Sequence, residues 1–431
     1  MSASASVFRK FDITSADGKK TVSLVGGITC FQYFEDLFSP TITAVVEVSA
    51  TNLVDKGKLG ESVYNSLPIT VGSKVDFKVY TPLDSAQGQS EGRLGYTLYV
   101  KTVTDVIQSQ NQEVFTLHLV SREAIRNQHV RVTKKYVQQS IDKIVKDMVQ
   151  LTEPILMEEF EKCEGTINYI GNMRKPFTNA INLASKAIPA GAKSKTAGFF
   201  FWQTRKGFNF RSIKSLIKNA NKNKKNLAKF RLTNDRSTSI ANPARNAFKV
   251  LDFSITTDEE LIESLQKGEK STYRIFFNPL DHSFTQPNKS KYLEEPPDLL
   301  GKQQKEAPVA DRKSIPANMF ASRVITEILD VGTLTSGVST AVNYNGNEYI
   351  SQSIVAYGSL FTHQVQLTIP VHTELMAGDA VYLEIPKVES GSNEFSLDTV
   401  SGIYIIKEIS HLFLANESYS GMRLIKNAEG I

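Results

Sequence analysis

Residues 375–386 read LMAGDAVYLEIP, and residues 69–80, which lie 306 positions earlier, read ITVGSKVDFKVY. When the two stretches are aligned without a gap, Gly72 falls on Gly378, and the alternating apolar side chains that follow each glycine coincide. Apolar residues at every second position are typical of a strand with one buried face. Each stretch therefore predicts a glycine turn followed by a half-buried β-strand.

The likeness continues across a loop of different sequence. Three further pairs of segments match, the second with one residue of slip: 99–103 with 405–409, 115–117 with 422–424, and 37–38 with 360–361. Two β-hairpins could resemble each other by chance, but alternation alone would not keep the register across a loop of roughly twenty residues in both copies. We therefore interpret the repeat as a duplicated β module, a small antiparallel barrel or sandwich whose sheet edges must be paired or covered.

Between the two copies the sequence predicts helices and a hairpin. Residues 136–151 place apolar side chains on one helical face, and a second helix is expected over residues 176–188. Residues 198–211 predict a hairpin with a buried aromatic strand and a turn through Lys206 and Gly207.

Further along, Thr257 and Glu260 form a capping-box pattern that predicts a short helix ending at Gly268. Residues 294–316 are rich in proline and charge and predict a surface loop or linker. The expected domains are a first β-barrel (1–121), a helical middle domain (122–198), a hairpin with a basic segment that partly joins the second barrel (199–255), an insertion with the proline-rich loop (256–335) and a second β-barrel (336–431).

The composition is that of an ordinary globular protein. The chain has 431 residues, a formal net charge of +5 and two cysteines, Cys30 and Cys163. The charge is too small to indicate nucleic acid or a membrane by itself, and a chain of this size needs no disulfide, although one is possible. The N-terminus lacks the apolar core of a secretory signal, and no run of about 18 apolar residues occurs. We therefore expect a soluble protein made in a cytoplasm, without membrane insertion.

Motifs for catalysis or metal binding are missing. The six histidines lack zinc spacing, and the sequence has neither a dinucleotide-binding Gly-x-Gly-x-x-Gly nor a Gly-x-Ser-x-Gly motif. Residues 268–271 (GEKS) resemble the end of a phosphate loop, but Glu263 stands where that loop needs glycine. His118 and His411 lie in alternating strands and are expected to be structural. We predict no enzyme, no catalytic residue, no cofactor and no metal site.

One block of positive charge stands out. Residues 165–234 contain no Asp or Glu, whereas residues 205–231 contain ten basic residues. The block could be a solvated basic loop and helix, or it could bind an acidic protein neighbour or nucleic acid. Of the two binding hypotheses we favour the acidic neighbour. Ten phosphate contacts would hold DNA tightly, which suits an anchoring protein but would hinder DNA that must slide through a channel. The candidate partner-binding residues are Arg205, Lys206, Arg211, Lys214, Lys218, Lys222, Lys224, Lys225, Lys229 and Arg231.

Four stretches carry a resemblance to a known family. They are residues 34–43 (FEDLFSPTIT), the helical segments 138–151 and 176–188 with the aromatic strand that ends in Trp202 and Gln203, residues 248–280 with 316–330, and residues 375–386 with 402–411. Together they resemble the baseplate central hub subunit of T-even-type contractile-tailed bacteriophages, the protein that caps the tail tube. They cover most of the chain in the family's order.

The resemblance implies an α+β, mainly β fold with two duplicated tail-tube-like antiparallel β-barrels, a helical middle region and an α/β insertion. It implies a homotrimer without enzymatic activity, located in the tail baseplate of the virion and assembled in the host cytoplasm. Three copies would place six similar barrels in a ring, so that a threefold object can meet a sixfold tail tube and a threefold spike. The expected partners are the trimeric spike protein, the tail-tube protein and neighbouring baseplate proteins. DNA would pass through the lumen without sequence-specific binding.

Two features depart from the family. The lysine-rich residues 214–231 are longer and more basic than expected, and we expect residues 205–231 to face outward or to lie against a baseplate neighbour. No needle repeat follows the second barrel, so the spike is expected to be a separate chain. The alternatives are a standalone β-rich binding module, the hub part of a contractile secretion system, and an enzyme.

Overall fold

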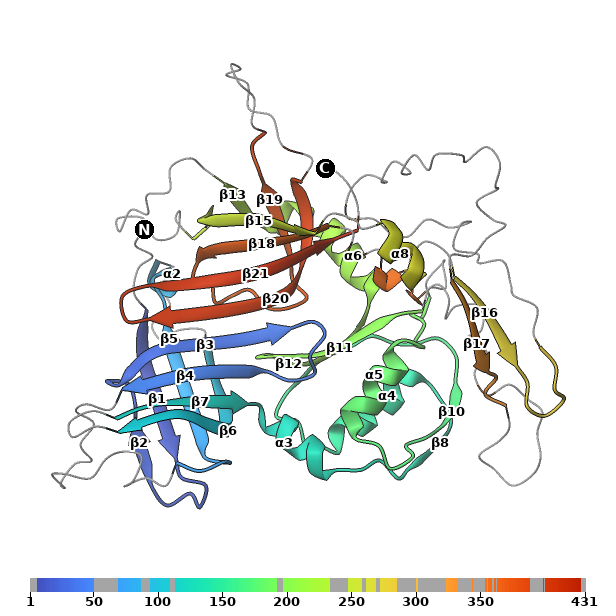
Figure 1. Ribbon diagram of the computed structural model, residues 1–431, viewed down its shortest axis with the longest axis horizontal. Coiled ribbons are helices and arrows are strands. Elements are labelled where there is room, and N and C mark those ends of the chain that lie inside the picture. The colour runs from blue at the N-terminus through green and yellow to red at the C-terminus, as the bar shows by residue number, and fades with distance from the viewer. Residues whose placement is uncertain are drawn as a thin grey trace.

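Figure 1 shows the computed structural model of the chain. The structure describes residues 6–49, 69–86, 94–108, 113–191, 197–232, 247–257, 261–268, 272–284, 300, 323–331, 343, 353–354, 356–358, 360–361, 363–387, 398 and 400–427. Strands predominate in this part of the chain, and two β units lie beside a region of helices and shorter strands.

The first β unit is an antiparallel sheet in the order β3-β4-β7-β6-β5-β1-β2. Its elements are β1 (Val7–Thr14), β2 (Thr21–Ser23), β3 (Ile28–Asp36), β4 (Thr43–Ser49), β5 (Lys74–Tyr80), α2 (Pro82–Ala86), β6 (Leu94–Gln108) and β7 (Glu113–Val120). The rings of Phe31 in β3 and Phe77 in β5 lie 4.9 Å apart, although β4, β7 and β6 separate their strands. The sheet therefore curls around one apolar core, and alternate side chains of each strand face that core.

The second β unit has the strand order β13-β19-β20-β21-β18-β15, with the two-residue strand β14 beside β13. Its strands are β13 (Ala228–Leu232), β14 (Lys249–Val250), β15 (Asp252–Thr257), β18 (His363–Pro370), β19 (Ala380–Glu384), β20 (Gly402–Leu414) and β21 (Ser418–Lys426). β13 joins β19 in parallel, whereas β19, β20, β21, β18 and β15 are antiparallel neighbours. Phe230 of β13 lies in the same core as Leu383 and Met422.

A helical region lies beside the two β units. It comprises α3 (Arg122–His129), β8 (Lys135–Gln139), α4 (Ile141–Gln150), β9 (Met157–Phe160), β10 (Ile167–Ile170), α5 (Pro176–Ala184), β11 (Phe199–Thr204), β12 (Gly207–Ser212), α6 (Ile213–Lys222) and the 3-10 helix η1 (Lys224–Asn226). Ile144 and Met148 of α4 and Phe177 of α5 share one core with the aromatic strand β11. The predicted hairpin is confirmed as β11 and β12, but its turn lies at Arg205 and Lys206, one residue earlier than expected.

The helix predicted over residues 136–151 is wrong in its first part. Tyr136 belongs to β8, which pairs with β10, and the helix begins only at Ile141 after the extended Ser140. Val137, which we placed on the apolar helical face, is exposed, whereas Tyr136 is buried. Pairing with β10 therefore outweighs the helical spacing of these residues.

The insertion contains α8 (Leu261–Lys267), β16 (Thr272–Phe277) and β17 (Arg323–Ile328), and the two strands pair in parallel. Gly268 follows α8 with a φ of +79°, as the helix-ending glycine predicts. Glu260 of the expected capping box lies outside the described residues, as does the linker predicted over 294–316 apart from Leu300.

The two repeated glycine turns have the same conformation. Gly72 and Gly378 have φ angles of +92° and +90°, in the left-handed region that favours glycine. The amide of Gly72 donates to Val100 O at 2.8 Å, and the amide of Gly378 donates to Ile406 O at 2.9 Å. Val100 and Ile406 are again 306 positions apart, so both turns hold the following strand at the same place.

The strands after the turns also share their pairing. Lys74 lies opposite Tyr99 in β5–β6, and Ala380 lies opposite Ile405 in β19–β20, which is the same offset. The register of β6 against β7 then shifts directly after Val100, and that of β20 against β21 shifts at the equivalent position. The first two strands of the repeat therefore fold alike, down to the bulge.

The closing strands correspond in a register that corrects the predicted one. Leu117 lies opposite Val103, and Met422 lies opposite Ile409, so the counterpart of Met422 is Leu117 and not Phe115. The upstream strands β4 and β18 likewise correspond in a register two residues away from the predicted one. A shift by two keeps every side chain on its face of the sheet, so alternation cannot detect it.

Neither unit closes into a barrel among the described residues, and this corrects the prediction of two barrels. β20 pairs with β19 at its beginning, and after its bulge it pairs with β3 of the first unit. Because β20 uses this edge for β3, the two units form one continuous sheet of 14 strands.

Candidate functional site

The junction between the two β units contains buried polar side chains, among them Glu35 and His411. There β20 lies antiparallel to β3, with Ser410 opposite Phe34 and Leu412 opposite Gln32. The tip of the β11–β12 hairpin reaches this junction, as Figure 1 shows. Three segments that are distant in the sequence therefore meet at one place.

Glu35 at the end of β3 connects these three segments. Glu35 is 2% exposed, and its carboxylate accepts hydrogen bonds from Tyr33 Oη at 2.9 Å, from the Arg205 amide at 3.0 Å and from the Ala377 amide at 3.1 Å. Burial raises the pKa of Glu35, and the charge of Arg205 opposes that rise. The Arg205 guanidinium donates to the carbonyls of Thr373 and Glu374 in the second unit.

Trp202 and Gln203 fix the hairpin against both units. Trp202 Nε1 donates to Ala377 O at 3.0 Å, and a Cβ atom on Gly378 would lie only 2.7 Å from Cζ2 of this indole. Gln203 Nε2 donates to Glu123 Oε2 at 3.1 Å, while Gln203 Oε1 accepts from the Ile42 amide at 3.3 Å. Removal of either side chain would leave buried polar groups without partners.

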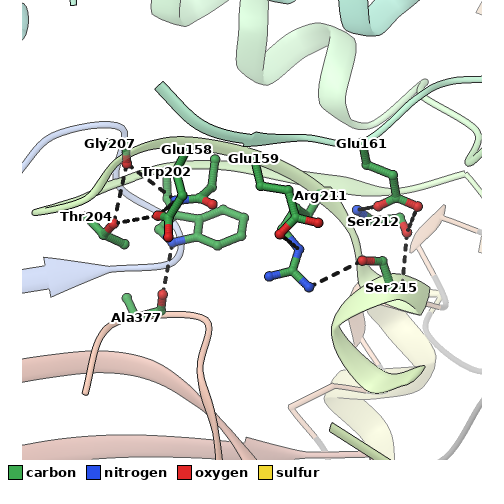
Figure 2. A network of polar contacts seen from close by, with 11 residues as sticks. Glu158, Glu159, Glu161, Trp202, Thr204, Gly207, Arg211, Ser212, Ser215 and Ala377 are labelled. Atoms are coloured by element: carbon green, nitrogen blue, oxygen red, sulfur yellow. Dashed lines mark hydrogen bonds and ion pairs between the residues drawn. The ribbon is translucent and has the colours of Figure 1, made fainter. Parts of the chain in front are cut away.

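Figure 2 shows that acidic side chains of β9 and the residue after it hold the other side of the hairpin. Glu158 accepts from Thr204 Oγ1 at 3.0 Å and from Asn209 Nδ2 at 2.8 Å. Glu161 accepts from the Ser212 amide at 2.7 Å and from its hydroxyl at 2.9 Å. The hairpin is thus held by carboxylates on both sides.

His411 and His118, which were expected to be structural, each lie near a hydroxyl group of a neighbouring strand. His411 Nδ1 lies 2.8 Å from Ser420 Oγ, and the ring stacks on Tyr33 across the junction. Burial, followed by the charges of Arg205 and His372, lowers the pKa of His411 to about 3. His118 Nε2 lies 3.2 Å from Thr104 Oγ1.

Eight strands form a continuous run through the junction, in the order β15-β18-β21-β20-β3-β4-β7-β6. The face of this run opposite the two cores carries mostly polar side chains, including Gln32, Thr43, Thr116, Gln366 and Ser410. A cleft of about 470 Å³ lies on this open face between strands of the two units.

Both ends of this run are open edges. β6 pairs with β5 only up to Tyr99, so residues 101–108 have β7 on one side and no partner strand on the other among the described residues. Within the same part of the chain, β15 pairs only with β18. Apolar side chains are exposed at both edges, Ile107 to 64% and Ile255 to 48%. Such edges are templates for pairing with another chain.

The structure places the ten basic candidates in different surroundings. Arg205 and Arg211 are used inside the chain, since Arg205 donates to the second unit and Arg211 Nε lies 3.4 Å from Glu159. Lys206 is exposed at the hairpin turn, and Lys214 is half-buried on α6. The exposed remainder gathers on α6, η1 and β13 and comprises Lys218, Lys222, Lys224, Lys225, Lys229 and Arg231.

The described residues contain no cluster of side chains suited to a metal ion, and none of their helices is both long and apolar enough to cross a bilayer. Cys30 and Cys163 are both free thiols. No pattern in the sequence pointed to the polar residues of the junction as a group. One signal could have revealed Glu35, because it continues the buried positions Phe31 and Tyr33 of β3 as a lone charge.

No family model matches the chain, and no curated protein matches it. Among solved structures, it is similar to the 43 kDa tail protein of prophage MuSo2 from Shewanella oneidensis, with 9% identity, a TM-score of 0.51, and coverage of 97% of this chain and 98% of that one. It is also similar to a tail protein from Neisseria meningitidis MC58, with 8% identity, a TM-score of 0.54, and coverage of 98% and 97%. The chain has a tail-protein fold. The resemblance inferred from the sequence therefore agrees with the observed fold.

Proposed function

We propose that the chain is a structural subunit of a phage tail baseplate, a homotrimeric central hub that adapts a sixfold tail tube to a threefold spike. The observation that carries this proposal is the pairing of the two units. Within the chain, the two units pair at one junction, between β3 and β20. Each unit nevertheless contains counterparts of both of these strands, so a second junction of the same kind could form between copies.

The counterparts follow from the pairing registers. Tyr33 of β3 and Ile255 of β15 occupy equivalent positions, since they pair with Ala44 of β4 and Val365 of β18. β20 covers Tyr33, which is fully buried, whereas no strand among the described residues covers Ile255. β15 is thus the β3 of the second unit with its outer edge open.

The same reasoning applies to β6, the counterpart of β20. Leu412 of β20 pairs with Gln32 of β3, and the counterparts of these two residues are Ile107 and Ser254. We therefore expect β6 of one copy to lie antiparallel to β15 of the next, with Ile107 opposite Ser254. The contact would repeat the in-chain junction between copies and cover the exposed apolar side chains.

A head-to-tail contact of this kind closes into a ring when its rotation allows. Three copies, the number that the hub resemblance implies, would supply six similar units around one axis. The polar open face would then line the lumen and let DNA pass without sequence-specific contacts. Spike, tube and neighbouring baseplate proteins would bind the two ends and the outside, and the proposal includes no catalytic step.

The mass in solution tests this proposal. We expect sedimentation at micromolar concentration, with tube and spike partners added if the chain alone does not associate, to give a species of three times the 47.9 kDa of one chain. The variant Ile255→Asp should shift the mass toward the monomer, because Ile255 is the counterpart of the fully buried Tyr33 and the variant would place a charge inside the contact. Leu151→Asp, at an exposed apolar residue distant from both edges in sequence, is the matched control and should leave the mass unchanged.

A cysteine pair tests the register itself. Strand neighbours directly opposite each other lie within disulfide reach, so the double variant Ile107→Cys with Ser254→Cys should form covalent dimers and trimers on oxidation. With Cys30 and Cys163, the two free thiols, replaced by serine throughout, each single variant should form none. A chain that stays monomeric with and without its partners would contradict the hub and favour the standalone binding module.

A further inference from the structure

We call the exposed cations of α6, η1 and β13 together the cationic face. It comprises Lys218, Lys222, Lys224, Lys225, Lys229 and Arg231. No Asp or Glu occurs between residues 165 and 234. The segment that carries the face therefore contributes no carboxylate of its own to balance it.

The fold presents these cations together. α6 begins at its N-cap Ser212 and buries Leu216 and Ile217 against the second unit, which leaves Lys218 and Lys222 on its solvent side. In β13 the buried Phe230 separates Lys229 and Arg231, and both of these point away from the core.

Residues from different elements converge around Tyr382 of β19. The ammonium groups of Lys224 and Lys229 lie 6.0 Å and 5.9 Å from the centroid of its ring. Lys426, which is 1% exposed, donates to Ser401 O at 3.0 Å. Burial, and then the charge of Lys224, lower the pKa of Lys426 to about 8, so the positive field of the face reaches this buried amine.

The cationic face borders one end of the open face. Ile425 of β21 packs beneath α6, and the next residues on the same side of that strand are Arg423 and Gly421, which line the cleft. α6 therefore covers the end of the polar face at which β20 begins, as Figure 1 shows. A chain bound to the cationic face would meet the molecule at this end.

We propose that the cationic face binds an acidic segment of another protein chain. Carboxylates of that segment would pair with the exposed ammonium groups, with Lys224 and Lys229 held over Tyr382 as the centre of the contact. The strongly hydrated lysine ammonium groups that dominate the face suit an exposed, salt-sensitive interface.

The same observations disfavour nucleic acid. Single-stranded nucleic acid binds where aromatic side chains stack on bases, and Tyr382, which lies beneath two of the ammonium groups, is only 9% exposed. If the proposed hub is correct, a phosphate-binding face at the end of a DNA conduit would also retard the DNA. The retardation of DNA counts against nucleic acid only if the proposed function is correct, whereas the proposed binding of an acidic segment does not depend on that function.

Fluorescence anisotropy with two labelled probes tests the proposal. The probes are a peptide of ten glutamates and an oligothymidine of equal charge, each titrated with the full chain at 50 mM and 200 mM salt. We expect the chain to bind the peptide more tightly than the oligonucleotide, and the higher salt to weaken peptide binding by roughly tenfold or more. The triple variant Lys222→Glu, Lys224→Glu, Lys229→Glu should weaken peptide binding at least about tenfold at 50 mM salt.

The matched control reverses three exposed lysines of the helical region, Lys143→Glu, Lys146→Glu and Lys162→Glu, and should change the affinity less than about threefold. Equal losses in both triple variants, or tighter binding of the oligonucleotide, would overturn the inference. A monomeric chain that binds the peptide through this face would support the inference while contradicting the hub, so the two failures can be distinguished.

Discussion

The repeated glycine turns allow one substitution to be made twice in the same chain. Gly72 and Gly378 share a left-handed backbone, but a Cβ atom on Gly72 would meet nothing within 4 Å, whereas one on Gly378 would meet the indole of Trp202 at 2.7 Å. The variant Gly72→Ala therefore introduces backbone strain alone, about 1–2 kcal/mol. Gly378→Ala adds about 1–3 kcal/mol of overpacking and weakens the hydrogen bond from Trp202 to Ala377 O, about 1 kcal/mol more.

The single tryptophan of the chain provides the assay, because its fluorescence reports on this contact without labelling. We expect urea unfolding to show that Gly378→Ala loses roughly 2–4 kcal/mol more than Gly72→Ala. In the native state, the emission of Gly378→Ala should move to longer wavelength as the indole leaves its buried site, and that of Gly72→Ala should stay at the wild-type position. In a Trp202→Leu background, which has no tryptophan and is followed by circular dichroism, Gly378→Ala should cost less than it does in the wild type, since the smaller side chain relieves the clash.

Equal losses in the two alanine variants, with unchanged emission in both, would refute this reasoning. They would mean that Trp202 does not pack on the Gly378 turn and that the hairpin is not fixed to the second unit there. The comparison is free of differences in backbone conformation, because the two turns have φ angles within a few degrees of each other.

Two further predictions concern buried titratable groups. The pKa of His411 is about 3 in the folded chain and near 6.5 in the unfolded chain, so the stability from its neutral form is present above pH 6.5 and is lost as the pH falls toward 3. Over this pH range, the unfolding free energy of the wild type should fall by up to about 1.4 kcal/mol per pH unit more than that of His411→Gln. Equal slopes in the two proteins would contradict the burial of this ring. Burial raises the pKa of the Cys163 thiol, so a thiol reagent should leave Cys163 unmodified in the native chain and should modify both cysteines after unfolding. If neither cysteine of the unfolded chain reacted, the two thiols would not be free.

Much of the repeat could be predicted from the sequence because its signals are local. A glycine that must adopt a left-handed conformation and a strand that must bury every second side chain both leave a mark within a few residues. The turns at Gly72 and Gly378 and the register of the first strand pair were therefore predictable. The closing strand was misplaced by two residues, since such a shift leaves the pattern of buried faces unchanged.

The junction could not be predicted in the same way. Glu35, Trp202 and Ala377 meet from segments that lie far apart in the chain, and no periodicity connects them. The basic residues show a related limit, because composition treats Arg205 and Lys229 alike. Only the fold shows that Arg205 donates to carbonyls inside the chain, whereas Lys229 faces solvent.

The hairpin gives a physical reason why two similar units need not behave alike. Its tip covers the turn of the second unit through Trp202. In the part of the chain that the structure describes, no side chain covers the equivalent turn of the first unit, and Val71 is exposed where Ala377 is buried. Each chain has one such hairpin, so the hairpin can support the junction within the chain but not the proposed junction with the next chain. In the proposed ring, junctions within a chain, which the hairpin supports, would therefore alternate with junctions between chains, which it does not support. A ring of six similar units built in this way has threefold symmetry, which is what an adaptor between a sixfold tube and a threefold spike requires.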